Sequence, residues 1–286
     1  MRLKLAHVAM LALALLPMLV YGAHAQNPDT IAPEQSAAKA KHILQQAIDA
    51  LGGQAYRDNK ELDCEGRLAQ FGHAGGMMGF VNYRNYWLFP DKNRTEYIVN
   101  STKGGMFAVL IGNLPIKGST LVQVFSGNEG WVLTKEGVNE AESTDVAQFQ
   151  EAVKHNLRNV LLTRVNEEGV YLRYGGLATV DLHPVEWIEI TNREEGSVRL
   201  AVDHSTHLPA RIVITSKDEV TGEMDEDVTI FSNYQPHEGI QMPMQVTRLH
   251  NDRRTYQLFY NACNANPNLP ADFFTKEGLT KGAKKK

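Results

Sequence analysis

The chain has 286 residues, with 29 Lys and Arg against 33 Asp and Glu, and a formal net charge of −4. This mild acidity argues against nucleic acid as a partner, because binding to phosphates needs a basic surface. The length fits one large β domain or two small ones. No linker rich in Pro, Ser or Gly divides the chain, which favours one domain.

The first 25 residues have the features of an export signal. Arg2 and Lys4 precede an apolar run, and Ala23 and Ala25 place small residues at the positions that signal peptidase recognises. An uncleaved membrane anchor is the alternative, but Pro17 interrupts a run that is shorter than the roughly 20 residues of a spanning helix. We expect a soluble periplasmic protein, with no transmembrane span after cleavage of residues 1–25.

Two helices and many short strands are predicted. Apolar residues at three- and four-residue spacing indicate helices over residues 33–51 and 146–161. Elsewhere apolar and polar residues alternate, as at Val198, Leu200 and Val202, which is typical of half-buried antiparallel strands. Strands are expected at residues 61–71, 80–89, 94–99, 107–111, 121–125, 131–134, 171–177, 185–190, 198–202, 210–215, 227–234, 241–249 and 256–263.

So many strands do not stay in one flat sheet without curling or splitting. A closed barrel, a half-open barrel and a sandwich are all compatible with the pattern. We expect a mainly β (α+β) fold, in which a curved antiparallel sheet forms a half-open β-barrel of about eleven strands with helices on its concave side. It should occupy residues 26–275 as a single domain. Lysines gather among Gly and Ala at residues 276–286, which predicts a disordered basic tail.

Cys64 and Cys263 are the two cysteines of the chain. They fall in the first and the last predicted strands, and an exported protein reaches a compartment that allows disulfides. A bridge between them would require the sheet to curl until those strands meet. Two unpaired buried thiols are equally compatible with the sequence, because sequence separation does not give a Cα distance.

Signals for catalysis and for metal binding are weak. His204 and His207 lie close together, but they fall between two alternating runs and read as a hairpin turn rather than a zinc site. There is no G-x-S-x-G elbow, no Rossmann glycine motif and no recognisable Cys/His pair. We therefore expect no enzyme activity, no metal and no cofactor.

Aromatic residues of the strands are the remaining candidates for a binding site. In strands such residues are usually part of the core. The functional alternative is that some of them line a cavity for acyl chains, and the candidates are Trp87, Phe89, Tyr97, Trp131 and Trp187. The glycines and methionines of residues 72–79 would suit a pliable cavity mouth.

Several turns, taken in order, resemble those of the bacterial outer-membrane lipoprotein-sorting proteins, the LolA/LolB-like family in its broad and divergent sense. They are ALGG at residues 50–53, EGRL at 65–68, FSGNEGW at 125–131, VDHSTHLP at 202–209, NY at 233–234, GIQMP at 239–243, NPNLP at 266–270 and FF at 273–274. The resemblance implies a half-open β-barrel closed by helices, which carries a lipid or a lipid-modified protein in the periplasm without a cofactor. An envelope sensor that binds a partner protein with the same fold is the second hypothesis, and a hydrolase is the third.

Overall fold

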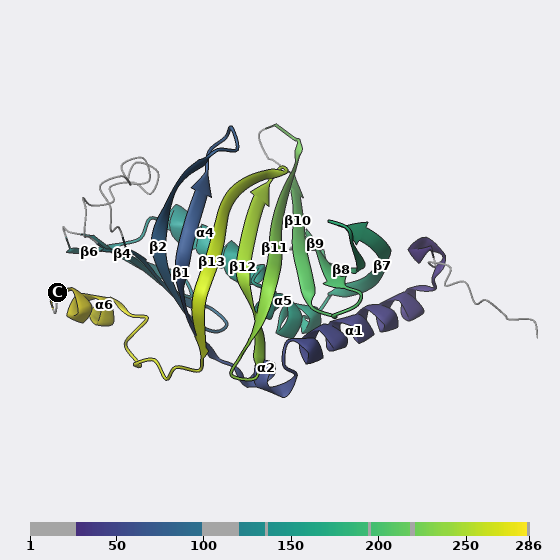
Figure 1. Cartoon of the computed structure of the whole chain (residues 1–286), viewed down its shortest axis with the longest axis horizontal. Helices are drawn as coiled ribbons and strands as arrows, with labels where there is room; N and C mark the ends of the chain where they lie inside the picture. Colours follow the sequence, from purple (N-terminus) through teal and green to yellow (C-terminus); the bar gives the residue numbers. More distant parts are fainter. Residues whose placement is uncertain (1–26, 99–119, 135–136, 194–195, 218–220, 285–286) are drawn as a thin grey trace, which may run out of the picture.

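The computed structural model describes residues 27–98, 120–134, 137–193, 196–217 and 221–284. Within these ranges thirteen strands form one antiparallel sheet that is strongly curved but not closed (Figure 1). The strands are β1 (Glu61–Phe71), β2 (Met77–Leu88), β3 (Lys92–Ile98), β4 (Thr120–Ser126), β5 (Glu129–Thr134), β6 (Gly137–Glu140), β7 (Tyr171–Val180), β8 (His183–Asn192), β9 (Gly196–Asp203), β10 (Pro209–Lys217), β11 (Met224–His237), β12 (Ile240–His250) and β13 (Arg253–Ala265). The helices are η1 (Pro28–Thr30), α1 (Pro33–Ala50), α2 (Gln54–Asp58), α4 (Ser143–Lys154), α5 (Leu157–Leu162), η3 (Arg164–Asn166) and α6 (Lys276–Lys284).

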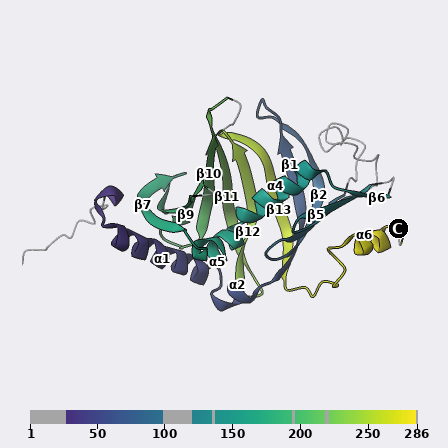
Figure 2. The ribbon, with the colours of Figure 1, turned by 180° about the vertical axis from the view of Figure 1, so that it is seen from behind.

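The order of the strands places the first and the last strand, β1 and β13, side by side at the centre of the sheet. It runs β6-β5-β4-β3-β2-β1-β13-β12-β11-β10-β9-β8-β7, so β1 pairs with β13 and the edges are β6 and β7. The connection between the two edge strands holds α4 and α5, which cross the concave face of the sheet (Figure 2). The expected curved sheet with helices on its concave side is therefore confirmed, with thirteen strands instead of about eleven.

Cys64 and Cys263 lie directly opposite each other in the β1–β13 pair and form a disulfide. The bond joins the first and last strands of the sheet, which are 199 residues apart in sequence at these positions. Of the two alternatives that the sequence left open, the structure has the bridge.

Turn motifs that are distant in sequence hold the base of the sheet together. Gly52 ends α1 with a φ of +126° and lies so close to the β11–β12 turn that a Cβ there would be 2.4 Å from the Gly239 oxygen. The Gln241 amide donates to the Leu51 oxygen at 2.9 Å. Asn266 Oδ1 accepts hydrogen bonds from the backbone amides of Lys60 and Glu61, at 2.8 and 3.2 Å. These turns therefore fix how α1 and the C-terminal segment meet the strands.

The helix expected over residues 146–161 is two helices. Asn156 separates them, because its side-chain oxygen accepts from the Arg158 amide at 2.9 Å and so caps a new helix, α5. The other predicted helix, residues 33–51, is confirmed as α1. The predicted strand at 107–111 and the predicted signal at 1–25 lie outside the described residues.

The prediction that residues 276–286 form a disordered tail is wrong for Lys276–Lys284, which form α6. Leu279 is fully buried beside Phe274, in a cluster with Val122 and Val124 of β4. One leucine and the preceding aromatic residues are enough to bury one side of this helix against the convex face of the sheet. Lys281 donates to Asp272 at 2.8 Å, and Lys276 pairs with Glu140 at 3.7 Å.

The disulfide predicts how the protein behaves on oxidation and reduction. Denatured, unreduced protein should show no free thiol in a thiol assay. The Cys64→Ala/Cys263→Ala variant should lose roughly 2–5 kcal/mol of unfolding free energy in chemical denaturation, because a long loop is no longer closed in the unfolded chain. Two reactive thiols in the unreduced protein, or an unchanged denaturation midpoint in the variant, would contradict the bridge.

Candidate functional site

A hollow of about 340 Å³ lies between the concave face of the sheet and the helices α2, α4 and α5. The volume lies in the range of sites for small ligands, which are concave and mostly apolar with a few polar groups. Its lining is Leu51, Tyr56, Asn59, Leu62, Tyr83, Asn85, Trp87, Phe89, Asn93, Thr95, Phe149, Ala152, His155, Asn156, Leu157, Arg158, Thr229, Phe231, Gln241, Met242, Pro243, Val246, Arg248, Tyr256, Leu258 and Tyr260.

Stacked aromatic rings connect α4 to the wall of the hollow. The rings of Trp87 and Phe89 stack with centroids 5.7 Å apart, and Phe149 of α4 lies 6.1 Å from Trp87 and 4.8 Å from Phe125. Phe149 is the buried residue of α4. Phe149 therefore anchors α4 to the concave face of the sheet, and Gln150 adds a hydrogen bond to Asn128 at 2.7 Å.

Tyr83, Tyr256 and Tyr260 form a second part of the wall, and Tyr97 packs against Tyr83 behind it. The ring of Tyr83 lies 5.7 Å from Tyr97 and 6.4 Å from Tyr260, between centroids, and Tyr256 follows on the same face of β13. Burial raises the pKa of all four phenols, and that of Tyr97 to about 12. These groups remain neutral at physiological pH and present apolar ring faces.

The polar side chains on β2 and β3 hydrogen-bond to the protein itself. Asn85 Nδ2 donates to Thr95 Oγ1 at 2.9 Å, and Thr95 Oγ1 donates to Asn93 Oδ1 at the same distance. Asn93 Nδ2 donates to the Tyr86 oxygen at 3.0 Å. An apolar ligand can cover these three polar side chains at little cost in free energy, because their hydrogen bonds within the protein are already made.

Three basic side chains also line the hollow. Arg248 is 3.5 Å from Asp227 across an ion pair, whereas Arg158 donates to the backbone oxygens of Tyr56 and Arg57. Burial, with the charges of Arg164 and Arg248, lowers the pKa of the His155 imidazole, against an opposing effect of Glu151. His155 is accordingly neutral near pH 7, and the two guanidinium groups carry the charge of the lining.

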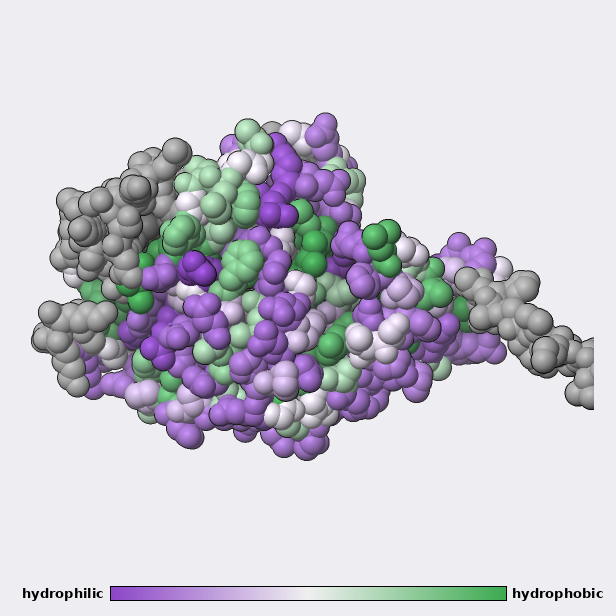
Figure 3. Space-filling model, in the orientation of Figure 1, coloured by the Kyte–Doolittle hydropathy of each residue, from purple (hydrophilic) through white to green (hydrophobic). Residues whose placement is uncertain are grey.

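Two of the five predicted cavity residues, Trp87 and Phe89, line this hollow, and Tyr97 packs against the lining residue Tyr83. Trp131 and Trp187 do not line it. Trp131 clusters with Tyr86, Val122 and Val124 on the opposite face of the sheet, under α6. Trp187 clusters with Val185, Ala201 and Val213, away from the core that faces α1 and α5. Figure 3 shows that opposite face, where hydrophobic side chains lie scattered among hydrophilic ones.

The lining residues that the sequence did not single out come from several strands and from the helices α2, α4 and α5. Tyr256, Leu258 and Tyr260 carried a signal, since their alternation marks one face of a strand. Phe149 belonged to the apolar stripe of a predicted helix. Nothing in the local sequence marks Arg158 or Asn59.

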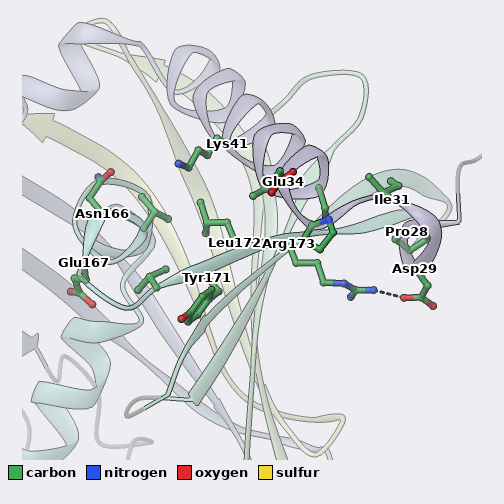
Figure 4. Close-up of a pocket in the computed structure, with 15 residues that line it drawn as sticks. Pro28, Asp29, Ile31, Glu34, Lys41, Asn166, Glu167, Tyr171, Leu172 and Arg173 are labelled. Carbon is green, nitrogen blue, oxygen red and sulfur yellow. Dashed lines mark hydrogen bonds and ion pairs between the residues drawn. The ribbon is translucent and has the colours of Figure 1, made fainter.

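A second, larger groove of about 870 Å³ lies outside the barrel, between α1, η1, η3 and the edge strand β7 (Figure 4). Its lining mixes the apolar residues Ile31, Val170 and Leu172 with charged ones, and Arg173 pairs with Asp29 across one end. The lining of this groove includes both carboxylates and basic side chains. The inner hollow, with its aromatic wall and helical cover, is the better site for an apolar ligand despite its smaller volume.

The turn at residues 204–206 is a hairpin turn between β9 and β10, as predicted. Asp203 Oδ1 accepts from the amides of Ser205 and Thr206 at 3.0 and 2.7 Å, and His204 lies 3.4 Å from Glu186. In the part of the chain that the structure describes, no group of three or more His, Cys, Asp or Glu is arranged to hold a metal ion. No helix within the described ranges has the length and apolar character needed to cross a membrane.

Comparison with known proteins gives the class of fold. No family model matches the sequence, and none of the curated proteins matches it. A domain from Vibrio parahaemolyticus described as an outer membrane lipoprotein-sorting protein superposes with a TM-score of 0.54, at 11% identity over 85% of this chain and 99% of that one. A DUF1329 family protein from Desulfovibrio piger gives 0.56, at 14% identity over 84% and 98% of the two chains.

A LolA superfamily protein from Nitrosomonas europaea gives a TM-score of 0.50, at 15% identity over 84% of this chain and 99% of that one. These likenesses cover nearly the whole of the other chains and most of this one. At such identities they establish the fold alone. The chain has the LolA-like half-open barrel that its turn motifs predicted.

The buried tyrosines predict a loss of stability at alkaline pH. A phenol whose pKa is raised in the folded state stabilises the fold fully below its unfolded pKa of 10.0, and this stability is lost as the pH rises through the folded pKa, about 12 for Tyr97. The unfolding free energy should therefore decrease above pH 10. Denaturation followed by circular dichroism at increasing pH measures it, with tyrosinate absorbance recorded in parallel. Ionisation of all tyrosines near pH 10 in the folded protein would contradict their burial.

Proposed function

We propose that this chain is a periplasmic binding protein of the carrier type, which holds an acyl chain of a lipid or of a lipid-modified protein in the hollow beneath α4 and α5. The observation that supports it is an aromatic and aliphatic hollow on the concave face of a half-open barrel. The fold is one that includes a described lipoprotein-sorting domain. The export signal predicted at residues 1–25 supports the location.

The size of the hollow suits one acyl chain. A methylene group fills about the volume of one water molecule in the liquid, ~30 Å³, so 340 Å³ accommodates on the order of eleven methylenes. Each buried methylene contributes about 0.8 kcal/mol, which gives a large apolar contribution before the cost of immobilising the chain. A ligand of this kind needs few polar contacts.

The lining supports binding without turnover. Among the described residues it contains no serine, cysteine, lysine or carboxylate, so it lacks the nucleophile and base pairs of hydrolases. Its one histidine, His155, lies between α4 and α5, where burial and the nearby arginines lower its pKa. The proposal therefore assigns no catalytic role to this site.

The second candidate function is an envelope sensor or protein-interaction domain of the same fold, and the edge strand β7 favours it. An unpaired edge presents backbone groups that a partner strand can pair with, and on β7 the Tyr174 amide is already donated to Ser36 Oγ of α1 at 2.9 Å. Tyr171 on this strand is 62% exposed, and Leu182 in the turn that follows is 93% exposed. A partner protein would bind there, outside the hollow.

Tryptophan fluorescence distinguishes the hollow from the rest of the protein. A brominated dodecanoic acid bound beneath α4 should quench Trp87, which lines the hollow, while Trp131 and Trp187 lie on the other face of the sheet. The Trp87→Phe variant should lose most of the quenching while still binding the ligand. The matched variant Trp131→Phe should keep it. Equal quenching in both variants would contradict acyl binding in this hollow.

A further inference from the structure

The charge of the hollow differs in sign from that of the protein. The whole chain is acidic, with a formal net charge of −4. The described lining of the hollow carries two charged side chains, Arg158 and Arg248, beside the neutral imidazole of His155, and no aspartate or glutamate. The outer groove beside β7, by contrast, is lined by acids as well as bases. An apolar hollow whose only formal charges are positive favours a ligand that is itself negatively charged.

Arg158 is the cation best placed to bind such a group. Its guanidinium lies between two rings of the lining, 5.3 Å from the centroid of Tyr56 and 5.0 Å from that of Phe89. Burial lowers the pKa of Arg158 from its ordinary value, against an opposing effect of Tyr56 and of the Asp58 carboxylate. Arg248 has Asp227 as an ion-pair partner, whereas within the described ranges no carboxylate lies at ion-pair distance from Arg158.

Arg158 also retains donors for a ligand. Two of its N–H groups are given to the oxygens of Tyr56 and Arg57, and a guanidinium has five. The backbone contacts fix the group in place without neutralising it. A fixed, partly desolvated guanidinium forms strong charge-assisted hydrogen bonds with a carboxylate or a phosphate.

A second, independent observation concerns Asn59, two residues after Arg57, whose backbone oxygen accepts from Arg158. Asn59 is 3% exposed, it lines the hollow, and its Oδ1 has no hydrogen-bond partner in the part of the chain that the structure describes. A buried acceptor without a donor destabilises a fold by about 1–3 kcal/mol, so a donor supplied by a ligand would be favourable here. Tyr56 and Asn59 belong to one short segment, which places the acceptor and Arg158 at the same end of the hollow.

We propose that the cargo is a single-chain anionic amphiphile, with its acyl chain along the aromatic wall and its carboxylate or phosphate on Arg158, and with a hydroxyl or amide donor of the same head group on Asn59. This inference rests on the proposed function and specifies its ligand. The hollow then has an apolar part around Trp87 and Phe149, for the acyl chain, and a polar end at Arg158, for the head group.

Calorimetric titration with four probes tests the inference. The probes are dodecyl phosphate, dodecanol, dodecyltrimethylammonium and inorganic phosphate, each titrated into the intact exported protein. The wild-type protein should bind dodecyl phosphate about 10- to 100-fold more tightly than dodecanol, the effect of one charge-assisted contact. The cationic amphiphile should bind more weakly than dodecanol, and inorganic phosphate alone should bind weakly or not at all.

Two variants locate the effect. Arg158→Gln retains an amide donor for the backbone oxygens but removes the charge, and it should lose the preference for dodecyl phosphate while it still binds dodecanol. The matched control Arg67→Met removes an arginine from β1 that contacts Phe80 on the other face of the sheet, and it should keep the preference. Dodecanol binding shows that each variant is folded.

The outcomes separate the ligand class from the function. Equal affinity of the wild-type protein for dodecyl phosphate and dodecanol overturns the anionic ligand and leaves the acyl carrier intact. Failure to bind any of the amphiphiles overturns the proposed function itself. Inorganic phosphate that binds as tightly as dodecyl phosphate shows a free-anion site and overturns the amphiphile. A preference that survives in Arg158→Gln overturns the assignment to Arg158.

Discussion

The pairing of the first strand with the last determines the rest of this structure. Because β1 and β13 meet at the centre of the sheet, β6 and β7 become its two edges, and the chain must pass from one edge to the other in the middle of the sequence. That connection crosses the concave face as α4 and α5 (Figure 2). The disulfide between Cys64 and Cys263 secures the pairing on which this arrangement depends.

The crossing helices cover the concave face without filling it. α1 and α5 pack into the main core with Ile188, Leu200 and Ile212. α4 has fewer buried contacts and is held chiefly by Phe149, so the space beneath it stays open and becomes the hollow. The convex face is completed by α6, whose Leu279 covers the strands at one end. The hollow therefore arises where a strongly curved sheet is covered by short helices that do not fill its concave side.

Much of the fold was predictable because it depends on local patterns. The alternation at Val198, Leu200 and Val202 gave the strand, and all three side chains face one core. The site was less predictable, because it depends on which face each strand turns inward. Bulges between Glu65 and Gly66, and between Tyr174 and Gly176, shift that alternation along the strands.

The pattern of one strand does not show which of its faces matches the concave face of the sheet. Trp87, Trp131 and Trp187 were therefore equal candidates until the structure placed them on different faces. The same limit applies to α6, where one buried leucine outweighs a series of lysines, and to Arg158, whose place in a lining without aspartate or glutamate appears only in the folded chain. Such features belong to the assembled site and have no local signature. Some of the turn motifs indicated the fold because they contact other elements at the base of the sheet, as Gly52 does with Gly239 and Asn266 does with Lys60 and Glu61.

The central claim is that the hollow beneath α4 and α5 holds an acyl chain. Native mass spectrometry of the protein purified from an envelope fraction, with extraction and identification of any bound lipid, tests it most directly. The account predicts a stoichiometric species heavier than the polypeptide by the mass of one acyl-bearing molecule, which is released on extraction. Protein that is empty and that co-purifies with one envelope protein would contradict the carrier and favour the interaction domain.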